Sequence, residues 1–316
     1  MIRIKREGWF PLIAVSLLVF LVLAVLPSIT MAQDDECNRR CLLEMLTKYT
    51  EALADNDISK LPISEDLRVT NNGLVTDLGT GDAWGQVNRI PYRQAFVDPV
   101  TGSAMFLGTL TNTPTRNHEI WWFYALRLKV ENRELTEVEE IFFDGTLGGT
   151  PASIQQRADR IFDTVLPESE RVSREELFHI ADLYFDAVSF RIDYNDVPWH
   201  PECTRVELAA FTVNSELNPA SCGGEFQNPG MKWLVENRRF YIADEVRGVV
   251  FAIGNFMTPP DYPNNNGSVV FEVFKIQDGL IRHIEAHFRG NNTQKVSGWG
   301  TGPGSGTDSG SNSGND

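Results

Sequence analysis

"FKIQDGLIRHIEAHF" (274–288) decides the fold, because a tight-turn signal sits between two runs of alternating apolar residues. Asp278-Gly279 is typical of a two-residue hairpin turn, and the residues after it alternate as those of a strand do. Alternation places His283, Glu285 and His287 on one face of that strand. The spacing H-x-E-x-H lacks the i, i+4 relation of a helical zinc-protease motif.

The same pattern occurs a second time in the chain. "LKVENRELTEVEEIF" (128–142) aligns without gaps on 274–288 at an offset of 146 residues, and the same offset carries 92–108 onto 238–254. Earlier in each half the offset falls to 135 or 136 residues, so the second copy carries an insertion around 216–230. Matched blocks at one constant offset indicate a tandem duplication.

Each copy has one order of elements. An amphipathic helical pattern opens it, at 42–53 and at 174–190, and hairpin-linked strands follow. This order predicts an α+β class in which helices lie against one face of an antiparallel sheet. We expect domains at 33–145 and 174–300, joined by a linker at 146–173.

The two ends of the chain differ from the rest in composition. Residues 1–32 have a basic start, an apolar stretch and a small-residue cleavage signal, which is the layout of a secretory signal peptide. An uncleaved membrane anchor is the alternative, and it would be the chain's only membrane contact. The tail at 301–316 is rich in Gly, Ser, Asn and Asp and is predicted to be disordered. We therefore expect an exported protein, periplasmic or extracellular.

The charge and the motif content exclude several classes of function. The net charge of −15 and the lack of a basic run argue against nucleic acid as a partner. The sequence has no G-x-S-x-G, P-loop or dinucleotide fingerprint, so hydrolase-triad, nucleotide and nicotinamide functions lack support, and no cofactor is predicted. Contact between the two domains is expected, and a dimer is possible.

The four cysteines predict disulfides in an exported chain, since oxidising compartments favour them. Four cysteines allow three pairings. We favour Cys37 with Cys41 and Cys203 with Cys222, because each pair is local. No C-x-x-C pair accompanies them, and no metal site is predicted.

The chain resembles the nuclear transport factor two-like, or SnoaL-like, superfamily in its "hK(I/V)x(D/N)GxIxxIE" ending, seen at 274–285 and more weakly at 128–139. More narrowly, it resembles a family of secreted bacterial and fungal proteins that carry two such domains in tandem. The matching motifs are C-x-x-x-C before a helix with Y-x-x-A-L (37–53), C-x-R-x-E (203–207) and SGWG (297–300).

This resemblance implies two cystatin-like cone domains, each with helices packed on a strongly curved sheet around a deep apolar pocket. Relatives with this fold carry out isomerisation, dehydration or elimination, and others only bind partners, so the fold alone does not give the function. The chain departs from the family at Asn71, where an acid is expected. Its counterpart Glu207 keeps the acid, so the second copy is the better candidate for chemistry.

Arg205 and Glu207 are the first candidates for catalysis, because alternation places both on one strand face. An arginine there could hold the carboxylate or an anionic substrate, while the competing interpretation is a structural ion pair. His200 lies close to them in sequence. We therefore assign Glu207 or His200 as the base and Arg205 as the group that stabilises developing charge.

Aromatic and basic residues are candidates for binding the substrate. Arg239 and Tyr241 precede a turn, as Tyr92 does in the first copy, and recurrence in both copies also fits a purely structural role. Trp84 and Trp199 could wall a pocket. His283, Glu285 and His287 are expected to face solvent or a polar groove rather than a metal.

The function predicted from these residues is an exported lyase or isomerase that binds a small, largely apolar molecule and works by proton abstraction. The alternative is a non-catalytic module that binds a ligand or a protein partner. The sequence leaves the choice between enzyme and binding module open.

Overall fold

The computed structural model describes residues 37–112, 120–143, 160–213, 221–223, 233–259, 267–289 and 298–299. The predicted signal peptide and tail lie outside the described residues, and the predicted domain bounds stay predictions. In the described part of the chain, no helix is long and apolar enough to cross a membrane.

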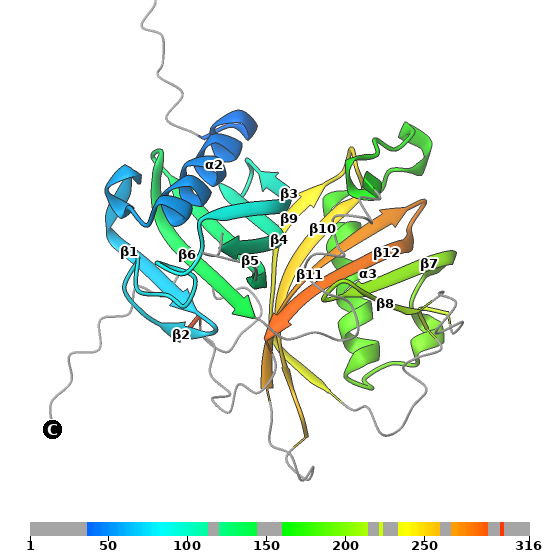
Figure 1. Cartoon of the computed structure of the whole chain (residues 1–316). Helices are drawn as coiled ribbons and strands as arrows, with labels where there is room; N and C mark the ends of the chain where they lie inside the picture. The colour runs from blue at the N-terminus through cyan, green and yellow to red at the C-terminus, as the bar shows by residue number, and fades with distance from the viewer. Residues whose placement is uncertain are drawn as a thin grey trace, which may run out of the picture. The chain divides into compact units, whose positions relative to one another are not determined.

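Two six-stranded sheets follow each other along the chain, each preceded by one α-helix (Figure 1). The first copy comprises α2 (Arg39–Asp55), η1 (Ile58–Lys60), β1 (Ile63–Asn71), β2 (Leu74–Val75), β3 (Arg89–Asp98), β4 (Ser103–Asn112), β5 (Ile120–Glu131) and β6 (Glu134–Phe143). Then come η3 (Arg160–Asp163), η4 (Glu168–Glu170), α3 (Arg174–Val188), η5 (Tyr194–Asp196), β7 (Trp199–Glu207), β8 (Ala210–Val213), β9 (Leu234–Asp244), β10 (Val249–Met257), β11 (Gly267–Gln277) and β12 (Leu280–Arg289).

The two sheets share one topology. The strand orders are β2-β1-β6-β5-β4-β3 and β8-β7-β12-β11-β10-β9, so every strand of the first sheet has a counterpart in the second. In each, one pair is parallel, β1 with β6 and β7 with β12. The predicted tandem repeat is therefore confirmed as two sheet-rich domains, made mostly of strands with few helices.

The hairpin predicted at 274–288 forms, and so does its counterpart at 128–142. Asp278 and Gly279 link β11 to β12 with φ angles of 52° and 71°, and Asn132 and Arg133 link β5 to β6 with 50° and 64°. Positive φ at both central residues is the requirement of a type I′ turn, whose twist matches that of the strands. The predicted strand after Gly279 is confirmed as β12.

Both helices begin with side-chain caps. Asn38 accepts a hydrogen bond from the Cys41 backbone N–H, and Ser173 accepts one from that of Glu176. Ser173 and Glu176 have the S-x-x-E spacing of a capping box. The buried residues of α2 belong to one core with strand residues of the first sheet, and those of α3 to a second core with the second sheet.

The other face of each sheet is buried against its sister sheet. A third core combines residues of β3–β6 with residues of β9–β11: Phe96, Met105, Leu107, Ala125, Ile141, Ile242, Val249, Phe251, Ile253, Val269, Phe271 and Val273. Since both faces are covered, the central strands are apolar on both sides, as buried strands are. This packing makes the two copies one folded body.

The segment after each copy packs on the other copy. Phe162, which follows the first sheet, stacks near His283 of β12, with ring centroids 5.3 Å apart. Trp299, which follows the second sheet, donates from its indole N–H to the Thr70 hydroxyl of β1 at 2.9 Å. Each copy is thus contacted by the segment that follows the other copy in the sequence.

Both predicted disulfides are present. Cys37 bonds to Cys41 and Cys203 bonds to Cys222, and the described part of the chain contains no free cysteine. Such bridges persist in oxidising compartments. They indicate an exported environment.

Candidate functional site

A carboxyl group is buried in the middle of the second sheet. Glu272 of β11 is 1% exposed and lies opposite Ala252 on one side and Ala286 on the other. Burial raises its pKa to about 8, and a hydrogen bond from Tyr184 only partly opposes this. One of its oxygens, Oε2, has no hydrogen-bond partner among the described residues. At pH 7 Glu272 is therefore mainly a neutral carboxylic acid.

Tyr184 connects Glu272 to an ion pair at the edge of the sheet. This tyrosine belongs to α3 and is buried, and its hydroxyl is hydrogen-bonded to both Glu272 and Arg205. Burial alone would lower the pKa of Arg205, but Glu207 and Tyr184 raise it, so the guanidinium stays charged. Arg205 Nε lies 3.2 Å from Glu207 Oε1 and donates to the Thr212 hydroxyl at 2.9 Å. The four side chains form a continuous polar path from the buried acid to the half-exposed Glu207.

The first copy also has a buried carboxyl group, but there two tyrosine hydroxyls contact it. Glu140 of β6 accepts hydrogen bonds from the hydroxyl of Tyr49 at 2.9 Å and from that of Tyr124. Burial raises the pKa of Glu140, while these two hydrogen bonds lower it. Tyr49 of α2 occupies the repeat position of Tyr184, so the helix tyrosine is common to both copies.

The buried carboxyl group lies on β6 in the first copy and on β11 in the second copy. Glu140 lies directly opposite Leu126 of β5, and Glu272 lies directly opposite Ala286 of β12. The offset of 146 residues carries Glu140 onto Ala286, so each copy has one glutamate in this cross-strand pair, on opposite strands. The surroundings consequently differ: tyrosine hydroxyls flank Glu140, whereas Arg205 and Glu207 lie near Glu272.

A strained turn adjoins Glu207. Leu208 and Ala209 link β7 to β8 with φ angles of 44° and 63°, where the first copy has Asn72 and Gly73 at 51° and 83°. Left-handed backbone costs residues other than Gly and Asn roughly 1–2 kcal/mol each. Leu208 and Ala209 are buried together with Phe123 of the first sheet. This packing holds the turn and fixes the strand end that carries Glu207.

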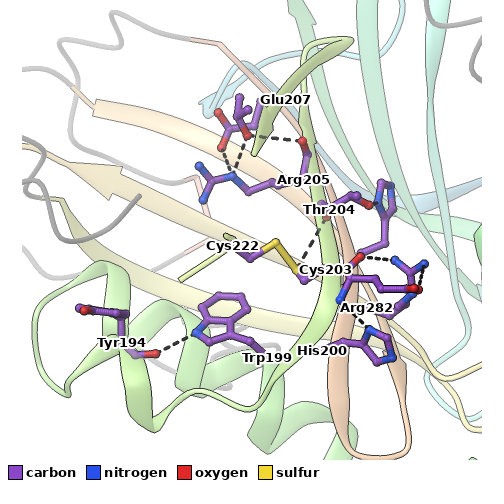
Figure 2. Close-up of a disulfide and its surroundings, with 12 residues drawn as sticks. Tyr194, Trp199, His200, Cys203, Thr204, Arg205, Glu207, Cys222 and Arg282 are labelled. Carbon is purple, nitrogen blue, oxygen red and sulfur yellow. Dashed lines mark hydrogen bonds and ion pairs between the residues drawn. A yellow bond between two sulfur atoms is a disulfide. The ribbon is translucent and has the colours of Figure 1, made fainter. Parts of the chain in front are cut away.

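The structure brings the predicted pair together but leaves His200 out. Arg205 and Glu207 lie on one side of β7, and His200 lies elsewhere, near Arg282 (Figure 2). Its Nδ1 accepts a hydrogen bond from the Glu202 backbone at 3.0 Å, which ties it to the strand's exposed end. His200 lies across the bulge of β7, between Trp199 and Thr204, from Arg205, and its catalytic role stays a prediction.

Trp199, which was predicted to line a pocket, lies next to Tyr184, the hydrogen-bond partner of the buried Glu272. Its indole N–H donates to the Tyr194 carbonyl at 2.8 Å, and its ring meets that of Tyr184 edge-on at 6.1 Å. Trp84 packs edge-on against Tyr49 in the first copy, at 5.8 Å. The two tryptophans therefore flank the two helix tyrosines.

Arg239 and Tyr241, predicted to bind substrate, lie between the two sheets. Arg239 donates to both carboxylate oxygens of Glu139 at 2.7 and 2.8 Å, and Tyr241 lies 4.2 Å under the Arg127 guanidinium. Arg239 pairs with Ile253, which faces the core shared by the sheets, so it points away from Tyr184. Tyr92 packs against a small cluster with Phe123.

The three residues of the H-x-E-x-H stretch are buried, contrary to the prediction of a solvent-facing strand. His283, Glu285 and His287 are 6%, 5% and 0% exposed, because the first sheet covers this face. Burial lowers the pKa of His283 to about 4 and that of His287 to about 3. In the described part of the chain, no cluster of His, Cys, Asp and Glu side chains could hold a metal ion. Of these three residues, His283 also lines a groove, and a polar groove was one of the two surroundings predicted for them.

Glu272, Tyr184 and Glu140 were not predicted as site residues from the sequence. Alternation puts a side chain on a face but does not say that a charged one will be buried. The available signal was a single carboxylate inside the apolar run of 267–274, together with a tyrosine that recurs in both helices.

Comparison with known proteins gives limited similarity. The profile of a family described as a domain of unknown function (DUF8021) matches residues 170–288, which is the second copy. The crystal structure of AclR from Streptomyces galilaeus, a proposed hydroxylase, is similar with a TM-score of 0.28 and 13% identity, covering 46% of this chain and 97% of AclR. No curated protein sequence matches the chain.

Proposed function

We propose that the second copy is a cofactor-independent lyase or isomerase that moves a proton on a small, largely apolar organic molecule. Each copy is then a SnoaL-like cone domain, exported to the periplasm or the cell exterior. The single observation that carries the proposal is the carboxyl group of Glu272, which is 1% exposed and has one oxygen unpartnered among the described residues; this burial raises its pKa to about 8.

A carboxyl group with this pKa suits acid–base work near neutral pH. A general base or acid is most effective when its pKa lies near the working pH, because both protonation states are then accessible. Carboxyl groups buried in apolar surroundings serve as acids and bases in this way. Glu272 meets this condition, which moves the acid–base role from His200 and Glu207 to Glu272.

Arg205, Tyr184 and Glu207 then have supporting roles. Tyr184 keeps its proton, because burial raises its pKa well above the ordinary value, and its hydroxyl can steady a carboxylate formed at Glu272. Arg205 supplies a fixed positive charge where negative charge develops. Glu207 holds Arg205 in place through the ion pair at 3.2 Å.

The asymmetry between the copies favours the second as the catalytic one. Glu140 is enclosed by two tyrosine hydroxyls, which satisfy its oxygen and leave it a structural acid. Glu272 has the helix tyrosine but, in place of the second one, the charged pair of Arg205 and Glu207. The first copy therefore encloses its buried carboxyl group between tyrosine hydroxyls, whereas the second copy places its buried carboxyl group near a charged pair.

The test is proton exchange in D2O with a panel of small ketones, such as cyclohexanone and acetophenone, read by mass spectrometry. The expected result is deuterium uptake that falls by roughly 10²–10⁴-fold in Glu272→Gln, the usual contribution of one acid–base group. Glu140→Gln is the matched control and should keep the exchange rate. Thermal melting of both variants shows that each is folded.

Two results would contradict the proposal. Equal loss of exchange in Glu272→Gln and Glu140→Gln would show that neither carboxyl is specific to the chemistry. Saturable binding of a ketone without exchange in the unmodified protein would favour the non-catalytic binding module instead.

A further inference from the structure

A groove of about 580 Å³ lies on the other side of the second sheet from Glu272. It is lined by Arg160, Ile161, Thr204, Phe211, Arg282 and His283. Its volume falls in the range of small-molecule sites, which is roughly 300–1,000 Å³. The alternation of β12 separates the two places, because His283 and Ala286, the partner of Glu272, point to opposite faces.

The floor of the groove is a hydroxyl–imidazole pair. Thr204 Oγ1 lies 2.6 Å from His283 Nδ1, and His283 is held by the ring of Phe162 at 5.3 Å. Thr204 is aimed at His283 by the bulge of β7, where the register jumps from Trp199 to Thr204 while β12 advances from Ile281 to His283. Bulges commonly re-aim side chains beside functional sites.

The walls of the groove carry positive charge in a strongly acidic protein. Arg282 bonds to the carbonyl and carboxylate of Glu202, and the Arg160 side chain is 83% exposed, with Asp163 at 3.9 Å. An adjoining hollow of about 440 Å³ shares Arg160 and adds Arg93. Asp163 also lines this hollow, so three arginines face two carboxylates, Asp163 and Glu202, and the net positive charge that remains favours an anion over a cation.

The first copy shows what kind of group fits this position. The repeat offsets carry Thr204 onto Arg68 and His283 onto Glu137. There the Arg68 guanidinium lies 4.8 Å from the centroid of the Trp299 ring, and the Arg127 guanidinium lies 4.6 Å from it. The first copy therefore places an aromatic ring of the chain itself against arginines at the place where the second copy has the groove.

We propose that this groove binds a small aromatic anion, such as an aryl carboxylate. The anionic group would lie between Arg160 and Arg282, with the Thr204 hydroxyl as a hydrogen-bond donor. The ring would pack on Phe211 and Ile161, which line the groove. His283 is neutral at pH 7, since burial lowers its pKa to about 4, so it adds a hydrogen-bonding group without charge.

The experiment uses the full chain and two probes of matched shape, benzoate and its neutral analogue benzamide. NMR titration, following the His283 ring signals, gives the Kd of each. The expected result is that benzoate binds at least tenfold more tightly than benzamide, and that Arg160→Gln weakens benzoate binding several-fold. Arg40→Gln is the matched control, because Arg40 is an exposed arginine on α2 whose side chain is 87% exposed.

Three outcomes would overturn the proposal. These are equal affinity for benzoate and benzamide, an equal effect of Arg160→Gln and Arg40→Gln, or shifts that leave the His283 signals unmoved. Glu272→Gln should leave benzoate binding unchanged. The proposals for this groove and for the catalytic site can therefore be refuted independently of each other.

Discussion

Replacing Glu139 with glutamine should destabilise the protein far more than a surface change of the same chemistry. Glu139 is 1% exposed and accepts from Arg239 at 2.7 and 2.8 Å and from Arg127 at 3.2 Å. Burial would raise the pKa of this carboxyl, but the two guanidinium groups lower it, so Glu139 is ionised in the folded state. An amide in its place leaves the buried Arg239 without its counter-charge, while Arg127 keeps only Glu137, at 2.6 Å.

The size of the effect follows from that burial. Removing one partner of a buried ion pair costs about 3–5 kcal/mol, because the charge left behind stays desolvated. The matched control is Asp55→Asn, which breaks the ion pair with Lys60 at 2.5 Å between side chains that are 59% and 46% exposed. A surface pair of this kind contributes about 1 kcal/mol or less.

The assay is urea unfolding followed by tryptophan fluorescence, with the free energy of unfolding taken from the transition midpoint and slope. Glu139→Gln should lose at least 2 kcal/mol more than Asp55→Asn, by the difference of the two magnitudes above. If the two variants differ by less than 0.5 kcal/mol or so, the ion pair between the sheets does not hold the copies together.

Three further predictions concern other contacts of the folded chain. Acid should destabilise the protein as the pH falls from about 6.5 toward 3, because His287 is neutral in the folded state and gains a proton on unfolding; His287→Gln should flatten this part of the stability profile, and an unchanged profile would contradict the assignment. Trp299→Ala should lower the melting temperature through the lost contacts with Thr70 and Arg127, whereas an unchanged value would show that the trailing segment does not hold the first copy. Reduction of Cys203–Cys222 should cost roughly 3 kcal/mol by the loop-entropy argument, and free thiols in the unreduced protein would exclude the bridge.

The sequence predicted the fold well where local rules apply. The repeat offset, the Asp278-Gly279 turn and the alternation after it suffice to place β12 and its counterpart. Local cysteine spacing was enough for both bridges. These features depend on residues that are near each other in the chain.

The predictions failed where the second face of each sheet mattered. Alternation showed that His283, Glu285 and His287 share a face, but only the packing of one sheet on the other shows that this face is buried. The same packing turned Arg239 into the partner of Glu139, which is 100 residues away in sequence. Single-sequence patterns carry no information on such long-range pairing.

The candidate site was predicted in part for a similar reason. Arg205 and Glu207 are two residues apart on one strand, so their pairing follows from the pleat. Glu272 and Tyr184 lie on a strand and a helix, and only the fold shows that they meet. His200 is close to Arg205 in sequence, but it lies on the other side of the β7 bulge, which closeness in sequence does not reveal.

The most direct test of the account is the titration of the Glu272 carboxyl. NMR of the protein with 13C-labelled glutamate, with Glu272 assigned from the Glu272→Gln variant, follows this group from pH 3 to pH 10. A pKa near 8 is predicted, and the contribution of Glu272 to stability, taken as the difference between the unmodified protein and Glu272→Gln, should fall as the pH rises from about 4.5 to 8, because the folded state keeps a proton that the unfolded chain releases. A carboxyl that titrates near its ordinary value, about 4.3, would contradict the proposal that Glu272 is the acid–base group.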